Sequence, residues 1–221
     1  ADIAGVPMIV QCLRRAEEAE VGPVVIACSE PEVAEAVEAA GGQAVLTDPD
    51  LPSGSDRIFA ALEVFDPEGK YDAIVNLQGD LPTLDPKVVR ACVAVLDNPE
   101  VDISTAVCAI TEESERDNPN VVKAVMALSG NARIGRALYF SRATVPTGPG
   151  DHFHHIGLYA YRRDALARFV SLPASPLETR EKLEQLRALE TGMRIDAALV
   201  DTVPLGVDTP ADLERARALL A

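Results

Sequence analysis

The fold is decided by the stretch VVIACSEPEVAEAVEAAGGQAVL, residues 24–46. It opens with a short apolar run rich in β-branched residues, Val24–Cys28, which is typical of a parallel strand buried on both faces. A helix follows with Pro31 in its first turn, and a Gly-Gly pair ends that helix before the next strand at residues 43–46. This strand, helix and strand spacing predicts an α/β fold with right-handed crossovers.

The same rhythm extends outward as far as residue 110. The expected helices cover residues 7–20, 55–65 and 86–96, and the expected strands cover 72–77 and 103–110. The rhythm then changes, because strands at 121–128, 137–141 and 156–161 have no full helix between them. They predict an antiparallel or mixed section joined by loops. The remaining expected elements are helices at 164–170, 176–192 and 210–220 and a strand at 195–203.

The length, composition and net charge of the chain exclude several classes of protein and of binding partner. A length of 221 residues suits one domain, and 48% hydrophobic with 25% charged residues excludes a disordered chain. The net charge of −15 argues against a basic surface that would bind nucleic acid or an anionic membrane. The sequence has no apolar run of the ~18–20 residues that a membrane helix needs, and it shows no signal peptide. We therefore expect a cytoplasmic protein whose four scattered cysteines are buried thiols.

The loop after the strand predicted at 72–77 carries the sequence Gln78-Gly79-Asp80-Leu81-Pro82. Ligands of open α/β sheets bind at the carboxyl ends of strands. Gly79 allows a ligand to approach the backbone closely, and Asp80 offers a hard oxygen for Mg²⁺ held together with substrate phosphates. The alternative is a solvated turn in which Asp80 caps the next helix.

A second loop, Ser53-Gly54-Ser55-Asp56-Arg57, leads into a helix whose free N–H groups could bind an anion or a base edge. Arg57 in the first turn opposes the helix dipole, which hints at a ligand. Plain capping by Ser53 or Ser55 is the simpler interpretation.

A third loop precedes the last helix. Thr209 as N-cap, Pro210 at the first helical position and Asp212 as the acid of a capping box are explained without any function. Asp208 lies outside that helix and is a second carboxylate that could complete a metal site with Asp80.

Polar residues interrupt apolar elements in the second half of the chain: Arg142, His154, His155, Tyr159, Glu184 and Gln185. His155 and Tyr159 are four residues apart on one predicted strand, so their side chains share a face. Each residue alone is more often structural, whereas a pocket for a hydroxylated acid would use all of them.

Together these motifs resemble the 3-deoxy-manno-octulosonate cytidylyltransferases, or CMP-Kdo synthetases. The matching strings occur in family order and span the chain: Pro7–Val10, Ser53–Arg57, Val75–Pro82, Asn118–Lys123, Tyr139–Pro146, His155–Arg162, Leu183–Arg187 and Gly206–Arg217. The sialic acid cytidylyltransferases share the fold but not this set of strings.

The resemblance implies a Rossmann-like nucleotidyltransferase core, with a mostly parallel sheet and helices on both faces. It implies one domain over residues 1–221, in which about 120–175 form a smaller mixed or antiparallel dimerisation subdomain. The implied reaction transfers CMP from CTP to 3-deoxy-D-manno-octulosonate (Kdo) and releases pyrophosphate, for lipopolysaccharide biosynthesis. The implied enzyme is a homodimer with CTP and Kdo as substrates.

The resemblance also implies the roles of individual residues. Asp80 and Asp208 would be the catalytic residues and would hold Mg²⁺. The nucleotide would be held by Ser53, Gly54, Ser55, Arg57 and Gln78, and the sugar acid by Arg142, His155, Tyr159, Glu184 and Gln185. Catalysis would then consist mainly of charge neutralisation and in-line positioning, and a dedicated protein base would be unnecessary.

Two features depart from the family pattern. Family members begin with a strand and an Arg-, Ser- and Lys-containing loop that cradles the triphosphate, just before the position of Ala1, so we expect a sequence trimmed there. Many members have Glu where this chain has Leu81, which leaves the implied metal ligands intact.

Two other functions stay open at this point. The missing phosphate loop would also suit a catalytically inactive nucleotide-fold module for binding or dimerisation. Alternatively, the acceptor is a related sugar acid, such as 8-amino Kdo or sialic acid, because one or two contacts can decide that choice.

Overall fold

The structure is a computed structural model that describes residues 1–220. The chain divides into two compact units. The first contains residues 1–72, 76–90 and those from Pro204 onward, and the second contains 73–75 and 91–203. The region expected to form a subdomain, about 120–175, therefore lies wholly inside the second unit.

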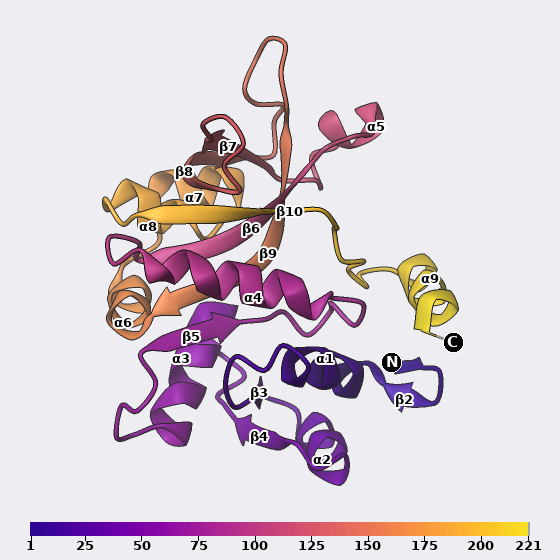
Figure 1. Ribbon diagram of the computed structural model, residues 1–221. Coiled ribbons are helices and arrows are strands. Elements are labelled where there is room, and N and C mark those ends of the chain that lie inside the picture. Colours follow the sequence, from indigo (N-terminus) through magenta and orange to yellow (C-terminus); the bar gives the residue numbers. More distant parts are fainter. Residues whose placement is uncertain (221) are drawn as a thin grey trace. The chain divides into compact units, whose positions relative to one another are not determined.

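The first unit is built on the strand, helix and strand stretch (Figure 1). Its central elements are β3 (Val25–Cys28), α2 (Pro31–Ala39), β4 (Gln43–Leu46) and α3 (Gly54–Phe65). β3 and β4 pair in parallel, with α2 as the crossover, and both α2 and α3 pack on them. A Cβ atom at Gly42 would lie 2.5 Å from a methyl carbon of Leu13, so the chain needs glycine to pass α1 (Met8–Glu17).

The prediction that the strand at Val24–Cys28 is buried on both faces is wrong. Val25, Ile26 and Ala27 are only half-buried, and Cys28 is buried. Within residues 1–220, β3 has β4 as its one partner strand, so its other edge is not covered by a strand.

A small hairpin that the sequence did not reveal lies at the start of the chain. β1 (Asp2–Ile3) and β2 (Val6–Pro7) pair antiparallel, and α9 (Pro210–Leu220) packs on β1. The guanidinium of Arg217 donates two hydrogen bonds to the Asp2 carbonyl, at 3.0 and 2.8 Å. The hairpin and the last helix therefore support each other.

The second unit is built on a six-stranded sheet with the order β5-β9-β6-β10-β8-β7. The strands are β5 (Ala73–Asn76), β6 (Ile103–Ala109), β7 (Lys123–Ala127), β8 (Ile134–Ser141), β9 (Phe153–Arg162) and β10 (Ile195–Val200). β6 and β10 are parallel, whereas β9 runs antiparallel to β6, and β8 runs antiparallel to β10 and β7.

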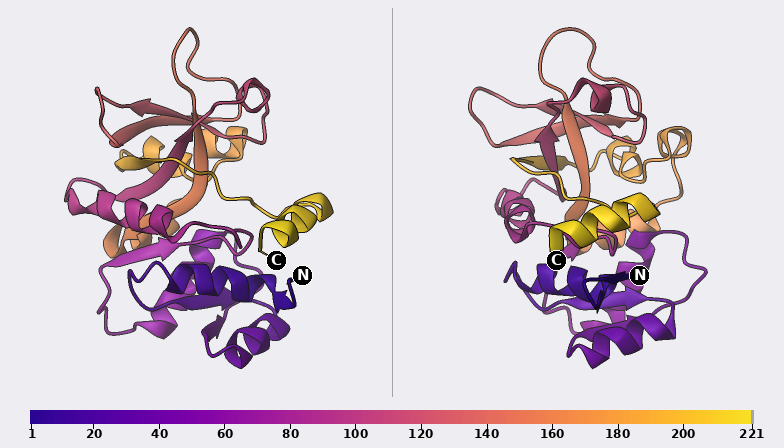
Figure 2. Two further views of the ribbon diagram at one scale, coloured as in Figure 1. Left: turned by 45° about the vertical axis from the view of Figure 1, so that its right-hand side comes forward. Right: turned by 90° about the vertical axis from the view of Figure 1, so that its right-hand side faces the viewer.

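The sheet is therefore mixed, and the expected mostly parallel sheet is not confirmed. β7, β8 and β9 follow one another without a crossover helix, and strands joined in this way pair antiparallel. Figure 2 shows the long connection between β8 and β9, residues 142–152, projecting from the sheet as an open loop.

The second unit also contains η1 (Val95–Asp97), α5 (Glu113–Arg116), α6 (Arg163–Ser171), α7 (Pro176–Glu181) and α8 (Leu186–Glu190), while α4 (Pro86–Ala94) begins in the first unit and ends in the second. The single helix predicted at 176–192 is wrong. Lys182 adopts the left-handed region with φ of 56°, which ends α7 and opens a turn before α8. No glycine or proline marks this break in the sequence, and the turn carries Glu184 and Gln185.

The four cysteines are free and buried, as the sequence predicted. Burial raises the pKa of Cys12 and of Cys92 to about 12, so both thiols stay protonated and unreactive at neutral pH. No helix within residues 1–220 is long and apolar enough to cross a membrane.

Candidate active site

The loop Gln78–Asp80 of the first unit is fixed from two sides. The thiol of Cys12 on α1 donates to the Gly79 carbonyl at 3.2 Å, and a Cβ atom at Gly79 would lie 3.3 Å from Ile9. On the other side, the N–H of Val207 donates to the Asp80 carbonyl at 2.9 Å. The segment before α9 therefore runs along the loop and brings Asp208 toward Asp80.

Asp80 and Asp208 form a carboxylate pair. The Oδ1 atom of Asp80 is buried and has no hydrogen-bond partner among residues 1–220. Burial raises the pKa of Asp80, and the nearby Asp208 carboxylate raises it further. Two neighbouring carboxylates, one with a bare buried oxygen, form an arrangement that attracts a cation.

This carboxylate pair fits the predicted Mg²⁺. Magnesium prefers oxygen ligands and is usually held by one or two carboxylates together with substrate phosphates and water. Residues 1–220 contain no cluster of three or more His, Cys, Asp or Glu side chains that could hold a metal. The protein would therefore supply two ligands, and the substrate and water would supply the rest.

The capping box predicted before the last helix is confirmed. The N–H of Asp212 donates to Thr209 Oγ1 at 3.2 Å, and the N–H of Thr209 donates to Asp212 Oδ2 at 3.0 Å. Pro210 is the first residue of α9. Asp208 meets this cap through its backbone, which hydrogen-bonds the Asp212 carboxylate.

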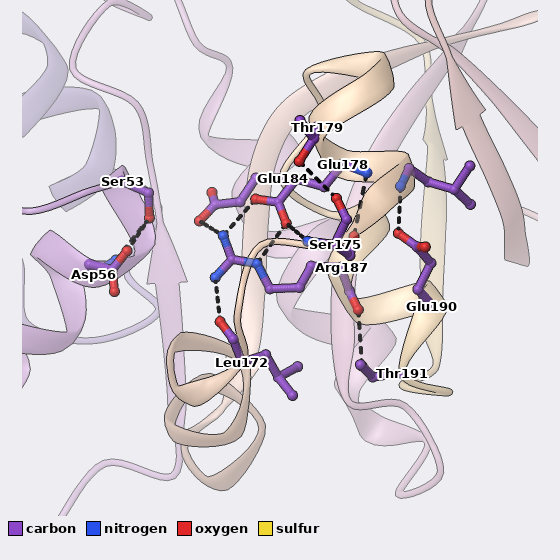
Figure 3. Close-up of polar contacts among 11 residues, drawn as sticks. Ser53, Asp56, Leu172, Ser175, Glu178, Thr179, Glu184, Arg187, Glu190 and Thr191 are labelled. Atoms are coloured by element: carbon purple, nitrogen blue, oxygen red, sulfur yellow. Dashed lines mark hydrogen bonds and ion pairs between the residues drawn. The ribbon is translucent and has the colours of Figure 1, made fainter.

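The start of α3 carries the residues predicted to hold the nucleotide. Ser53 caps the helix, because its hydroxyl accepts from the Asp56 N–H at 3.2 Å and donates to the Asp56 carboxylate at 2.6 Å (Figure 3). A Cβ atom at Gly54 would lie 3.8 Å from Gln78 Nε2, so the Gln78 amide lies beside the helix start. Ser55 is buried.

Arg57 turns away from the start of α3. Its Nη1 atom donates to Thr47 Oγ1 at 2.6 Å and to the Asp48 carbonyl at 3.4 Å, in the loop that follows β4. These contacts explain why an arginine is tolerated in the first turn without any appeal to a ligand.

Three of the predicted sugar-acid residues come together in the second unit. The ring centroids of His155 and Tyr159 are 5.4 Å apart, as their shared strand face predicted. Burial raises the pKa of Tyr159 well above its ordinary value, and Glu184 is among the nearby charges that raise it further. His155, Tyr159 and Glu184 therefore form one cluster, named here the acceptor cluster.

The hydrogen bonds of His155 define its protonation. Thr105 Oγ1 lies 2.7 Å from the Leu158 carbonyl, to which it donates, and 3.0 Å from His155 Nε2. The hydroxyl has a single hydrogen and also lies 3.2 Å from the Ile156 carbonyl, so these contacts favour the tautomer in which Nε2 donates and Nδ1 carries the lone pair. Burial lowers the pKa of His155 to about 3, which keeps the ring neutral at pH 7. His155 Nδ1 can accept a hydrogen bond from a ligand hydroxyl.

Arg142 follows β8 and is braced by backbone carbonyls. Its guanidinium donates to Glu181 O at 3.0 Å, Pro119 O at 3.1 Å and Lys182 O at 3.3 Å. These acceptors are neutral, so none of them offsets the positive charge of the guanidinium. A guanidinium has five N–H donors, and the remaining ones are available to an anion.

The turn between α7 and α8 is held by Arg187, which the sequence analysis did not single out. Arg187 donates to both carboxylate oxygens of Glu178, at 2.9 and 2.6 Å, and to the Leu172 carbonyl at 3.2 Å (Figure 3). Its Nη2 atom lies 4.0 Å from Glu184 Oε1. Beside Glu184, the side-chain nitrogen of Gln185 is buried and has no hydrogen-bond partner within residues 1–220.

Sequence reasoning missed Thr105, Arg187 and the bracing contacts of Arg142. Thr105 lies in the strand predicted at residues 103–110, and its partner His155 is 50 residues further along the chain. The signal that could have found Arg187 is its position among leucines, where an arginine requires a buried partner.

Comparison with known proteins gives first the class of enzyme. Residues 1–195 match the family model described as cytidylyltransferase. The 3-deoxy-manno-octulosonate cytidylyltransferase of Paramagnetospirillum magneticum is 70% identical over 220 residues, covering 100% of this chain and 89% of the relative. That of Rhodospirillum rubrum is 68% identical over 221 residues, covering 100% of this chain and 88% of the relative.

A solved structure of CMP:2-keto-3-deoxy-manno-octonic acid synthetase complexed with CTP is also similar. Its sequence is 37% identical to this chain, and the two structures match with a TM-score of 0.89. The match covers 99% of this chain and 89% of the other. The chain belongs to the 3-deoxy-manno-octulosonate cytidylyltransferase family, which the ordered motifs had predicted.

Proposed function

We propose that this protein transfers CMP from CTP to Kdo and releases pyrophosphate. The observation that carries the proposal is the carboxylate pair, in which a buried Asp80 oxygen without a partner lies near Asp208. The names and bound ligand of the similar proteins support the choice of substrates. The finer assignments of metal, residues and assembly are part of the same proposal.

The reaction forms one bond and breaks one. An anomeric hydroxyl oxygen of Kdo attacks the α-phosphorus of CTP, the bond from that phosphorus to the pyrophosphate oxygen breaks, and the hydroxyl proton is released. Both reactants are anions, so the barrier is lowered mainly by neutralising charge and by in-line positioning. Bound Mg²⁺ would supply that neutralisation and would favour ionisation of the sugar hydroxyl.

In the first unit, Asp80 and Asp208 would hold the metal. Gln78 and Gly54 would hold the nucleotide, because the Gln78 amide lies beside the glycine at the start of α3. Ser53 supports that helix start as the N-cap, and Ser55 is buried in the first turn. Arg57 would then act on the nucleotide only through the loop after β4 that it holds.

In the second unit, the partners of each group suggest its role toward the sugar acid. Arg142 would bind the carboxylate, because its guanidinium is braced by neutral carbonyls and retains free N–H groups. His155 Nδ1 would accept from a sugar hydroxyl, and Gln185 would donate from its buried amide nitrogen. Tyr159 and Glu184 would complete the acceptor cluster.

We further propose that the enzyme is a cytoplasmic homodimer that works in lipopolysaccharide biosynthesis. The family resemblance supports this setting.

The test is pyrophosphate release by the purified enzyme with CTP, Mg²⁺ and Kdo, and separately with 8-amino Kdo or sialic acid in place of Kdo. We expect turnover that requires Kdo and is lost when EDTA removes the metal. Faster turnover with another sugar acid would show that this acid, and not Kdo, is the preferred acceptor. No turnover with any acid would support an inactive binding module instead.

A further inference from the structure

Lys123, the first residue of β7, is a lysine with no exposed surface. Its ammonium donates to the carbonyls of Asn118 at 2.8 Å, Val121 at 2.6 Å and Arg142 at 2.8 Å. An ammonium has three N–H donors, so all of them are used on backbone oxygens. Burying a charge is costly unless it is well hydrogen-bonded, and a merely packed position in a strand would suit an apolar side chain better.

The three hydrogen bonds of the Lys123 ammonium all bear on the position of Arg142. One hydrogen bond holds the Arg142 carbonyl directly. The other two hold the turn at residues 118–121, and that turn provides the Pro119 carbonyl that receives Arg142 Nη1 at 3.1 Å. One buried ammonium thus fixes both the backbone from which the Arg142 side chain extends and an acceptor on which its guanidinium rests.

Neither the Lys123 ammonium nor the Arg142 guanidinium is hydrogen-bonded to a carboxylate in the described part of the chain. The acceptors of the Lys123 ammonium and of the Arg142 guanidinium are all carbonyls. Asp117 faces Lys123 from the turn, but its Oδ1 atom accepts from the Thr144 hydroxyl at 2.8 Å. Glu181 uses one carboxylate oxygen on the backbone N–H of Arg142, not on its guanidinium.

We infer that Lys123 is a positioning residue for the acceptor substrate, because it sets the orientation of the Arg142 guanidinium toward the carboxylate of a sugar acid. This inference rests on the proposed function, in which Arg142 contacts that carboxylate. Lys123 itself would not touch the substrate, since its three donors are already used.

The test is a double-mutant cycle on the full enzyme, with steady-state pyrophosphate release measured while Kdo or CTP is varied. We expect Lys123→Met to raise the KM for Kdo by about tenfold and to change the KM for CTP by less than about twofold. Arg142→Ala should raise the KM for Kdo at least as much. In the Arg142→Ala background, adding Lys123→Met should have less than about a twofold further effect, because Lys123 acts through Arg142.

Two controls separate positioning from a general loss of stability. Leu166→Ala removes a fully buried side chain of α6 in the same unit, and it should lower the melting temperature without changing the KM for Kdo. If Lys123→Met does not fold, Lys123→Gln replaces it, because the amide keeps two N–H donors. That variant should give a KM for Kdo between those of the wild type and Arg142→Ala.

The outcomes distinguish this inference from the proposed function. If Arg142→Ala leaves the KM for Kdo unchanged, the proposed role of Arg142 is wrong, and the role of Lys123 falls with it. If Arg142→Ala raises that KM but neither Lys123 variant does, only the inference is overturned. Multiplicative effects in the double variant would overturn it as well.

Discussion

The two units of this protein satisfy their buried charges in opposite ways. In the first unit, Asp80 has a buried oxygen without a partner in the described chain, and the nearest charge is a second carboxylate. In the second unit, Arg187 is 8% exposed, yet it has a two-point ion pair with Glu178 and a carbonyl partner. A charge that the fold neutralises contributes to the scaffold, whereas a charge left unbalanced needs a ligand.

The largest effect is expected where the charge is unbalanced. Asp80→Asn should lower kcat/KM for CMP transfer by about 10³-fold or more, because a metal ion contributes several kcal/mol of transition-state stabilisation. The same variant should melt no lower than the wild type in the absence of metal and substrates, since it removes one of two repelling carboxylates. Pyrophosphate release and thermal unfolding measure the two effects.

Asp212→Asn is the matched control for Asp80→Asn. Asp212 lies near Asp208 in sequence but serves the capping box of α9. It should keep nearly full activity and lose only a little stability, because the N-cap hydroxyl of Thr209 still accepts from the backbone. Equal losses of activity in both variants would remove the distinction between the paired carboxylates and ordinary surface acids.

Arg187→Met tests the balanced charge. Removing Arg187 leaves the partly buried Glu178 carboxylate with the Ser175 N–H as its hydrogen-bond partner, so the free energy of unfolding should fall by about 1–3 kcal/mol in urea titrations. Asp201→Asn is the control, because it breaks the exposed Arg133–Asp201 pair, whose two groups lie 2.8 Å apart. That pair should be worth about 0–1 kcal/mol. A loss for Arg187→Met no greater than for Asp201→Asn would contradict a scaffolding role.

The burial of His155 makes the free energy of unfolding depend on pH. The folded protein holds His155 with a pKa of about 3, whereas the unfolded chain protonates it near its ordinary 6.5. The unfolded state therefore binds more protons between these values, so stability rises with pH across this window and is constant above it. His155→Gln should reduce the stability lost from pH 7 to pH 5 by about 2 kcal/mol. Identical pH profiles in urea titrations would show that the buried imidazole is not the cause.

Arg142→Lys tests an intermediate case, a cation balanced only by carbonyls. Lysine keeps the charge but loses the planar fork, so the KM for Kdo should rise by about tenfold with little change in the KM for CTP. Arg136→Ala, which removes an exposed arginine on β8, the strand that precedes Arg142, should change neither constant. An equal rise of both KM values would mean that Arg142 does not discriminate between the substrates.

Much of the fold could be predicted from local patterns. The positions of β3, α2, β4 and α3 were correct because hydrophobic period, caps and glycine act over a few residues. The helix predicted at 176–192 failed for the opposite reason. At its break, the carbonyls of Glu181 and Lys182 accept hydrogen bonds from Arg142, about 40 residues earlier in the chain, and an unmarked residue with positive φ leaves no local signal.

The candidate site shows the same division. Asp80 was recognisable because it follows a strand, and Asp208 because no cap explained it. The protonation of His155 could not be predicted from the sequence, since it depends on Thr105, 50 residues away in the chain. Lys123 was visible only as part of a family string, and its role depends on carbonyls from two separate segments.

The sequence alone determined most of the strands and helices, the family and the residue types that can perform the chemistry, because these depend on neighbours along the chain and on the order of motifs. The tertiary structure decided that the sheet is mixed, that Arg187 is paired, and that Asp80 keeps an unpartnered oxygen. Whether a buried charge is satisfied depends on groups distant in sequence, and only folding brings them within hydrogen-bonding distance.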